Sequence, residues 1–340
     1  MKEFIQKLPK AELHLHIEGS LEPELMFELA KRNNIKIPYK TIQDIKNAYN
    51  FTNLQSFLDI YYAGANVLIT KQDFYDLTWN YILKCVENNI IHTEIFFDPQ
   101  SHTQRGIEFK TVILGIVEAL NDAKEKYGIT SAIVMCFLRH LSQEEALKTF
   151  DEALAFKDYI IGVGLDSSEI GNPPSKFEQV FKKAKEQGFK LVAHAGEEAD
   201  VSYIFEALDL LNIQRIDHGV QSIKSSFLME RLKKEQIPLT VCPNSNIELK
   251  VFENYSQHNI KELLDYGLNV SVNSDDPAYF KGYLNQNFIN LWENLDLGKE
   301  DIIKLVKNSL NSSFISDDLK KEYIKKVEQI INNEKTKGQI

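Results

Sequence analysis

Four short motifs place histidine and acidic side chains where they could bind a metal ion or move protons. His14 and His16 are separated by one residue, so both imidazoles project from the same face if this segment is a strand. The other motifs are His194-Ala195-Gly196-Glu197, Asp217-His218-Gly219 and Asn273-Ser274-Asp275-Asp276-Pro277. Each motif alone has a structural explanation, such as a buried histidine or a turn. Together they hold four of the eight histidines of the chain, which favours a catalytic site.

An alternation of short apolar runs with longer amphipathic stretches would bring these motifs together. The predicted strands are 12–16, 91–97, 132–138, 160–166, 190–194, 215–218, 238–242 and 269–273. Helices are predicted between them at 73–87, 109–127, 144–156, 175–187, 203–211, 227–235 and 260–266. Eight such units, with neither a GxGxxG nor a Walker motif, predict an α/β fold of the TIM (β/α)8 barrel type. All four motifs then lie at carboxyl ends of strands, where barrel enzymes hold catalytic groups.

Two predicted helical regions are additional to the eight strand–helix units of a minimal barrel. An insertion after the first strand, about 23–70, has predicted helices at 24–33, 42–48 and 54–68 and should cover the catalytic face. Within it, Phe57, Leu58 and Tyr61 form either an apolar lid or part of the core. Helices at 284–295, 299–310 and 317–331 follow the eighth strand, and the tail 335–340 is expected to fray. Without a linker in the sequence, we expect a single domain over residues 1–340.

Composition limits the class of partner. The chain of 340 residues is 43% hydrophobic, and its net charge of −10 argues against nucleic acid or an anionic membrane as a partner. Its three cysteines are far apart and form no CxxC pair, which indicates a reduced, cytoplasmic setting. The N-terminal segment lacks the apolar run of a signal peptide, and no stretch of 18 apolar residues predicts a membrane span.

The donor types indicate which metal would bind. Three imidazoles and one carboxylate suit a borderline ion such as Zn²⁺, and an open coordination position for water makes such a site catalytic. Barrel hydrolases with two metals usually bridge them with a carboxylated lysine after the fourth strand. This chain has Asp166-Ser167-Ser168-Glu169 at that point, without lysine. We therefore expect one zinc ion per chain.

Five segments, in this order, carry a resemblance to a known family: HLHIEGS, GLDSSEIGNPPSKF, AHAGEE, RIDHGV and VNSDDPAYF. On them the chain resembles the adenosine deaminase family of the amidohydrolase superfamily over nearly its whole length. The resemblance implies a zinc ion ligated by His14, His16, His194 and Asp275. The H-x-E…P-C-x-x-C signature of other zinc deaminases is absent from the sequence.

The resemblance also implies roles in catalysis. Glu197 would be the proton donor to the purine N1, His218 would orient or deprotonate the attacking water, and Asp276 would contact the purine N7. Zinc lowers the pKa of a bound water from 15.7 towards ~7, which makes hydroxide available for attack at C6. Asp166 and Asp217 either orient the ligands or act as structural caps.

Three segments resemble the adenine deaminase branch in particular: FFDPQSHTQRG, CFLRHLS and GLDSSEIGNPPSKF. Adenosine-specific relatives usually have HxHLDG, in which an aspartate stands where this chain has Glu18, and a small segment where it has Ser167-Ser168-Glu169. The bulkier groups would occupy the space of a ribose. The expected reaction is therefore hydrolysis of adenine to hypoxanthine and ammonia, with Glu18, Ser168 and Glu169 near the substrate. Asn244 departs from the usual family motif CPLSN, in which this position is apolar.

Two alternatives stay open at this stage. The enzyme could deaminate adenosine or another 6-aminopurine, such as an N6-substituted adenine or aminodeoxyfutalosine. The barrel could also bind a purine without turning it over, although the sequence lacks none of the implied ligands. A small 6-aminopurine is the expected partner, and the oligomeric state is left open.

Overall fold

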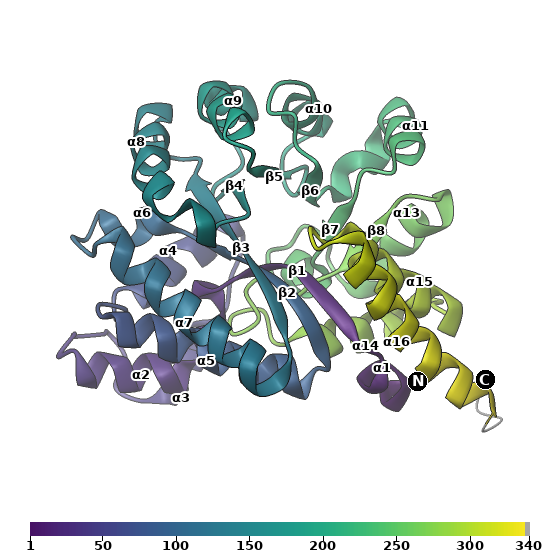
Figure 1. Ribbon diagram of the computed structural model, residues 1–340, viewed down its shortest axis with the longest axis horizontal. Helices are drawn as coiled ribbons and strands as arrows, with labels where there is room; N and C mark the ends of the chain where they lie inside the picture. The colour runs from purple at the N-terminus through teal and green to yellow at the C-terminus, as the bar shows by residue number, and fades with distance from the viewer. Residues whose placement is uncertain (337–340) are drawn as a thin grey trace.

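Eight parallel strands, hydrogen-bonded in chain order, form a barrel that helices surround (Figure 1). The computed structural model describes residues 1–336. The strands are β1 (Lys10–His16), β2 (Ile90–Phe97), β3 (Thr130–Leu138), β4 (Gly162–Asp166), β5 (Lys190–Ala195), β6 (Arg215–His218), β7 (Leu239–Val241) and β8 (Val270–Val272). The seam between β8 and β1 is bridged by Asp275, whose N–H donates to His14 O at 3.1 Å and whose O accepts from His16 N at 3.0 Å. The predicted TIM barrel is confirmed.

The last two strands are shorter than predicted. Both predicted segments span five residues, whereas β7 and β8 each contain three. Cys242 is the N-cap of helix α12 (Pro243–Glu248), and Pro243 occupies the first turn. Proline lacks the N–H that a strand needs but fits the start of a helix, so β7 ends before it.

Helices between the strands form the outer layer. They are α5 (Lys71–Glu87), α6 (Pro99–Thr103), α7 (Phe109–Tyr127), α8 (Gln143–Ala153), α9 (Glu178–Glu186), α10 (Val201–Asp209), α11 (Ser226–Glu235) and α13 (Ile260–Tyr266). Thr70 and Ser142 begin α5 and α8 with capping boxes, in which side chain and backbone satisfy each other's free groups. The predicted helix 144–156 ends early because the chain continues as the 3₁₀ segment η2 (Leu154–Tyr159), and the start of the predicted helix 175–187 is the 3₁₀ segment η3 (Pro174–Phe177).

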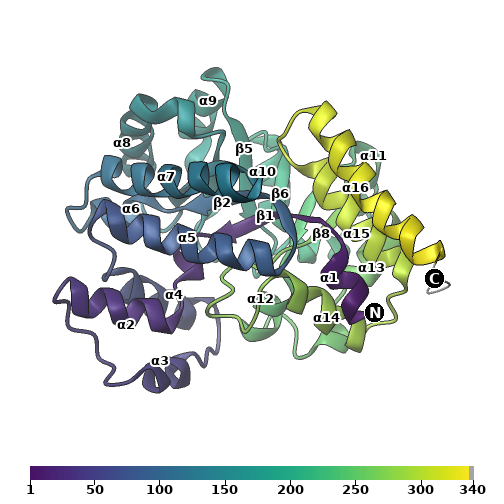
Figure 2. The same ribbon diagram turned by 60° about the horizontal axis from the view of Figure 1, so that its bottom comes forward.

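The predicted insertion after β1 is helical and begins with the 3₁₀ turn η1 (Glu18–Ser20). Its helices are α2 (Pro23–Arg32), α3 (Ile42–Ala48) and α4 (Leu54–Ala65), and Figure 2 shows α2 and α3 projecting beside the barrel. The inner face of α4 carries Phe57 and Tyr61, which are 3% exposed and lie within 6 Å, centroid to centroid, of the Tyr279 ring. The insertion is therefore anchored to the segment that follows β8.

The remaining helices close the other side of the molecule. They are α1 (Lys2–Lys7), α14 (Leu284–Asn294), α15 (Lys299–Ser312) and α16 (Asp317–Thr336). α1 and α16 lie side by side (Figures 1 and 2), and Lys7 Nζ donates to Glu334 Oε1 at 3.4 Å. In the predicted tail, Lys335 and Thr336 are helical and residues 337–340 lie outside the described part of the chain. Between residues 1 and 336, no helix is long and apolar enough to cross a membrane.

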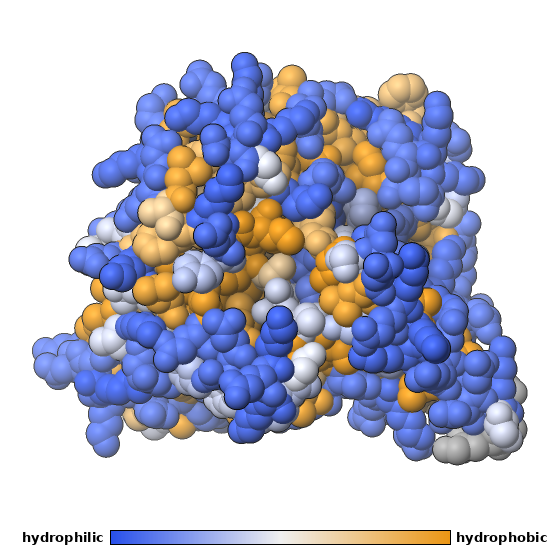
Figure 3. Space-filling model, viewed as in Figure 1, coloured by the Kyte–Doolittle hydropathy of each residue, from blue (hydrophilic) through white to orange (hydrophobic). Residues whose placement is uncertain are grey.

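The surface seen in Figure 3 is mostly hydrophilic at its edges, with apolar residues gathered towards the centre of that face. Inside the barrel, a small apolar cluster of Phe96, Val134, Cys136 and Val192 is separate from the large core between strands and helices. Polar groups also fill the barrel.

A buried ion pair fills the barrel interior near the start of β6. Arg215 Nη1 donates to Glu94 Oε2 at 2.5 Å and Nη2 donates to Leu13 O at 3.0 Å, and both charged side chains are fully buried. Burial alone would raise the pKa of Glu94, but the Arg215 and His92 charges and hydrogen bonds lower this pKa to about 2. The Phe314 ring covers the guanidinium at 4.7 Å. The pair is thus a fully desolvated charge pair on which β1, β2 and β6 all depend.

Replacing Arg215 by methionine should destabilise the fold strongly. The change leaves the Glu94 carboxylate buried without its cation, which typically costs about 3–5 kcal/mol. Urea unfolding followed by far-UV circular dichroism measures the change. Lys183→Met is the matched control, because Lys183 forms an exposed pair with Asp151 at 3.4 Å. A loss for Arg215→Met no larger than for this control would contradict the role given to the buried pair.

Candidate active site

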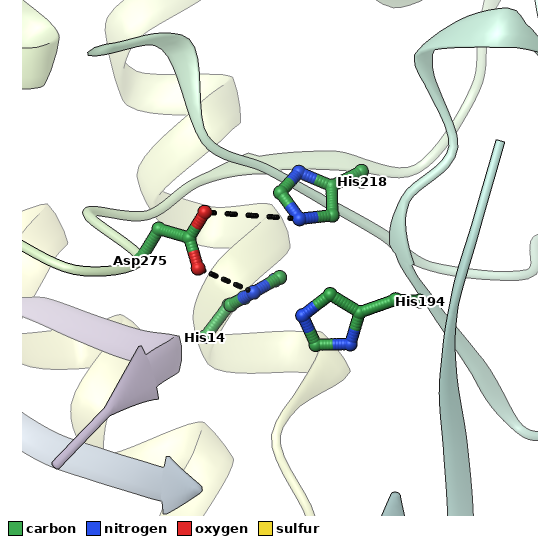
Figure 4. Close-up of side chains that lie close together, drawn as sticks. All are labelled: His14, His194, His218 and Asp275. Carbon is green, nitrogen blue, oxygen red and sulfur yellow. Dashed lines mark ion pairs between the residues drawn. The ribbon is translucent and has the colours of Figure 1, made fainter. Parts of the chain in front are cut away.

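Side chains from three strands and the segment after β8 converge at one buried point (Figure 4). His14, His194, His218 and Asp275 each offer a ligand atom within 4.8 Å of the others, and all four residues are buried. His14 Nε2 lies 3.0 Å from Asp275 Oδ1, and His218 Nε2 lies 3.7 Å from Asp275 Oδ2. The strand-end motifs of the sequence therefore meet in space.

His16 joins the same cluster from the end of β1. Its Nε2 lies 3.1 Å from His194 Nε2 and 3.4 Å from Asp275 Oδ1. The four residues expected as ligands, His14, His16, His194 and Asp275, are thus brought together, and His218 stands beside them. His16 is also close to Asp276. Together with Asp275, these two residues form a second group of possible metal ligands, which overlaps the first.

Hydrogen bonds behind two imidazoles determine which nitrogen faces the cluster. His194 Nδ1 lies 3.1 Å from Leu165 O, which can only accept, so Nδ1 carries the hydrogen and Nε2 presents a lone pair. His14 Nδ1 lies 3.0 Å from Thr240 Oγ1, which donates its own hydrogen to Asp217 Oδ1 at 2.8 Å. His14 Nδ1 therefore donates, and its buried Nε2 is directed at Asp275 Oδ1, 3.0 Å away. Two lone pairs and a carboxylate directed at one point fit a divalent cation.

Burial favours the neutral form of three of these imidazoles, which is the form that binds a metal. Burial lowers the pKa of His194 well below its usual value, lowers that of His16, and lowers that of His218 to about 3. Burial would also lower the pKa of His14, but the charge and hydrogen bond of Asp275 outweigh it and raise this pKa. Metal ligands must be deprotonated, so a bound cation would take the place of the proton that His14 and Asp275 otherwise share.

The backbone is held in an uncommon conformation at two of these residues. His218 has φ 66° and Asp275 has φ 64°, in the left-handed region that non-glycine residues rarely adopt. The two hydrogen bonds from Asp275 to β1 hold it in place. Such strain persists where the surrounding structure fixes it, and here it directs two side chains towards the cluster.

Glu197 is the acidic group best placed to transfer a proton. It is 3% exposed, its Oε2 lies 3.5 Å from His218 Nε2, and its Oε1 has no hydrogen-bond partner among the described residues. Burial raises the pKa of Glu197 well above its usual value, and the negative charge of Asp275 raises it further. A carboxyl group that stays protonated near neutral pH can act as a general acid.

Asp276 lies beside the cluster because residue 19 is glycine. A Cβ on Gly19 would stand 1.9 Å from Asp276 Oδ1, so only glycine leaves room for this carboxyl group. Asp276 is 4% exposed, and Oδ1 has no hydrogen-bond partner among residues 1–336. Its side chain is therefore free to bind a ligand.

A small cavity of about 30 Å³ adjoins these groups. It is lined by His16, Leu54, Phe57, Leu58, Tyr61, Tyr62, Asp98, Asp166, Ser167, His194, Glu197, His218, Leu249, Asp275 and Asp276. Helix α4 supplies one wall. Phe57, Leu58 and Tyr61 line the cavity and are also buried in the core, so both explanations offered for them apply.

Three residues expected near the substrate do not line this cavity. Glu18 Oε1 instead accepts from His102 Nε2 at 2.8 Å and from Asp98 N at 3.2 Å. The carboxylate of Glu169 accepts the four N–H groups of residues 196–199, at 2.6–3.1 Å. Ser168 is half-buried, and its carbonyl accepts from Asn172 Nδ2. The carboxylates of Glu18 and Glu169 thus support loops around the cavity, and a contact of these three residues with the substrate stays a prediction.

Asn244 is also outside the cavity lining. Its Oδ1 accepts from Tyr255 Oη at 2.8 Å and from Asn290 Nδ2 at 3.0 Å, in an amide network between α12 and α14. The polar side chain thus has structural partners outside the cavity lining.

Several lining residues were not identified from the sequence. Asp98 follows β2 directly, so the strand-end rule that selected the histidines applies to it as well. Tyr62 and Leu249 carry no comparable signal, because only tertiary packing brings them to the cavity, whereas Ser167 belongs to the segment that the sequence placed near the substrate.

A TIM barrel with this set of imidazoles and carboxyl groups at its carboxyl end belongs to the amidohydrolase class of enzymes, in which a divalent metal is typical. A sequence model of the adenosine deaminase family matches residues 9–330, and the chain belongs to that family.

Known relatives support this assignment. An adenine deaminase from Psychrobacter cryohalolentis is 77% identical over 331 residues, which cover 97% of this chain and all of that protein. The crystal structure of an adenine deaminase from Arthrobacter aurescens is 46% identical and superposes with a TM-score of 0.94 over 96% of this chain and 99% of its own. An amidohydrolase from Burkholderia ambifaria, solved with bound zinc, shares the fold at a TM-score of 0.89 and 23% identity, over 98% and 94% of the two chains.

The donor cluster predicts one equivalent of divalent metal per chain. His194→Ala removes a lone pair aimed at the cluster. Loss of a residue that only orients a ligand already lowers metal affinity by about 10- to 100-fold, so loss of the ligand itself should lower it by at least about 100-fold. Elemental analysis gives the stoichiometry, and competition with a chelator gives the affinity. His140→Ala, outside the cluster, is the control and should retain the metal. Two equivalents, or full retention by His194→Ala, would contradict this assignment.

Proposed function

We propose that the chain is a zinc-dependent adenine deaminase, which hydrolyses adenine to hypoxanthine and ammonia. The assignment of adenine as substrate rests on the 77% identity, over the full length of the relative, with a protein named adenine deaminase. The adenine deaminase of known structure agrees at 46% identity. A cytoplasmic location fits the three cysteines, which are buried and unpaired.

The donor set supports zinc as the metal. Imidazole nitrogen with one carboxylate oxygen is the ligand chemistry that Zn²⁺ prefers in catalytic sites. We assign His14, His16, His194 and Asp275 as ligands, because His14 and His16 both face Oδ1 of Asp275, whereas His218 faces Oδ2 on the side of Glu197. When bound, zinc lowers the pKa of a water molecule towards ~7 and so supplies a nucleophile.

The residues of the chain then direct the reaction at C6 of the base. Glu197 gives its proton to N1, which makes the ring susceptible to attack by the water oxygen at C6. His218, 3.5 Å from Glu197, orients the water and takes its proton. The new C–O bond forms at C6. His218 then passes the water proton to the exocyclic amino group, which leaves as ammonia when its C–N bond breaks. The proton that remains on the C6 hydroxyl returns to Glu197 as the carbonyl of hypoxanthine forms. Asp276 holds N7 and fixes the orientation of the ring.

The cavity supports a small substrate. Helix α4 covers it with Leu54, Phe57 and Leu58, whose apolar side chains exclude water from the reacting groups. The proximity of the proposed ligands to Asp275 and of Glu197 to His218 supports turnover over a barrel that only binds a purine.

Glu197→Gln should abolish most of the activity and leave the metal bound. Glutamine keeps the shape and hydrogen-bonding capacity but delivers no proton, and general acid catalysis contributes typically ~10²- to 10⁴-fold. We expect kcat for adenine to fall by at least 100-fold, measured as ammonia release, with the metal content of the wild type. A variant within tenfold of the wild-type kcat would rule out Glu197 as the proton donor.

Adenine should be preferred to adenosine by at least about 100-fold in kcat/KM. The ribose would have to displace protein atoms around the cavity, and overpacking costs roughly 1–3 kcal/mol, which is roughly 5- to 150-fold. Unsatisfied buried polar groups facing the sugar would add to this. Ammonia release from each substrate by the zinc-loaded enzyme measures the ratio. Equal or faster turnover of adenosine would overturn the substrate but leave the deaminase chemistry in place.

A further inference from the structure

Two buried carboxyl groups that the proposed mechanism does not use face the cavity. Asp98 follows β2 and Asp166 ends β4, and both line the cavity with 2% of their surface exposed. Neither oxygen of Asp166, nor Oδ1 of Asp98, has a hydrogen-bond partner among the described residues. Leaving a buried acceptor without a donor is costly, so these oxygens fit a ligand that donates a hydrogen bond.

The pair lies on the side of His16 that faces away from the metal cluster. Nε2 of His16 faces His194 and Asp275, whereas Asp166 Oδ2 lies 3.4 Å from Nδ1 of the same ring. His16, Asp98 and Asp166 each offer an atom within 4.8 Å of the other two. A purine with C6 at the metal and N7 at Asp276 would extend its five-membered ring past His16 towards this pair.

Asp98 is held in place by the residues behind it. Glu18 Oε1 accepts the Asp98 N–H, and it also accepts from His102 Nε2, whose hydrogen position is set because Arg105 Nη2 donates to His102 Nδ1 at 2.9 Å. From helix α4, Tyr61 Oη donates to Asp98 Oδ2 at 3.2 Å. These contacts use one oxygen of Asp98 and leave Oδ1 free. Glu18 therefore acts as a positioning residue for Asp98.

We propose that Asp98, with Asp166, selects the free base by accepting the N9–H hydrogen of its imidazole ring. A nucleoside has a carbon substituent at N9 and no hydrogen to donate, so its binding would leave Oδ1 of Asp98 without a donor. Whichever protonation state the pair adopts, at least one oxygen remains an acceptor. Sites built to bond a substrate N–H reject analogues that lack it by about 10⁴- to 10⁵-fold. This selection rests on the proposed function and adds a specificity determinant to it.

The test compares adenine with 9-methyladenine, which differs only in the group on N9. The wild type should prefer adenine by about 10⁴-fold in kcat/KM. Asp98→Ala should lower kcat/KM for adenine by at least about 100-fold and leave 9-methyladenine unchanged or improved, because the deleted carboxyl group leaves room for the methyl. Asp98→Asn should recover part of the activity on adenine, since its amide oxygen still accepts. Asp151→Asn, at the exposed pair on α8, is the control and should match the wild type.

Binding provides a second measurement that does not depend on turnover. Calorimetry on the zinc-loaded protein should show that hypoxanthine binds more tightly than 9-methylhypoxanthine, and that Asp98→Ala removes most of this difference. If Asp98→Ala weakens turnover or binding equally for the free base and for its 9-methyl derivative, the proposal is overturned and Asp98 is a structural residue. Loss of a second metal equivalent in Asp98→Ala would overturn it in favour of a cation site. If the wild type does not deaminate adenine at all, the proposed function itself fails. If it deaminates adenine but Asp98→Ala leaves the ratio of kcat/KM for adenine to that for 9-methyladenine unchanged, only the role of Asp98 fails.

Discussion

The site depends on one electrostatic constraint: several imidazoles and carboxyl groups are buried at a point where hydrogen bonds among themselves cannot satisfy them. His14 and His194 direct lone pairs at this point because their other nitrogens donate to Thr240 and Leu165. Asp275 adds carboxylate oxygens, which are acceptors as well. Such a set is stable around a cation and costly without one. The fold is built so that β1, β5 and β8 must all end correctly for the set to form.

Residues remote from the chemistry supply much of this precision. The carboxylate of Glu169 accepts four consecutive backbone N–H groups and so fixes the loop that carries Glu197. In the barrel interior, the Arg215–Glu94 pair joins β6 to β2, and Arg215 also bonds to the backbone of β1. Buried charges in these positions act on the reaction only through the groups they hold, so their substitution should affect stability and geometry together.

The sequence was sufficient to predict the barrel and the convergence of the motifs. The period-2 spacing of His14 and His16 and the placement of His194, His218 and Asp275 at strand ends follow from local rules. The directions of Glu18 and Glu169 could not be predicted in this way. Whether a carboxylate faces a cavity or a backbone loop depends on partners more than 25 positions away, such as His102 for Glu18. Similarly, the early end of α8 and the short β7 were decided by local backbone geometry that the hydrophobic pattern does not record.

The most direct test of the account is a titration of metal-free protein with zinc while ammonia release from adenine is recorded. If one ion among His14, His16, His194 and Asp275 completes the active site, activity should rise linearly with added zinc and reach its plateau at one equivalent per chain. Full activity in the metal-free protein, or a plateau only at two equivalents, would contradict the single-metal site on which the account depends.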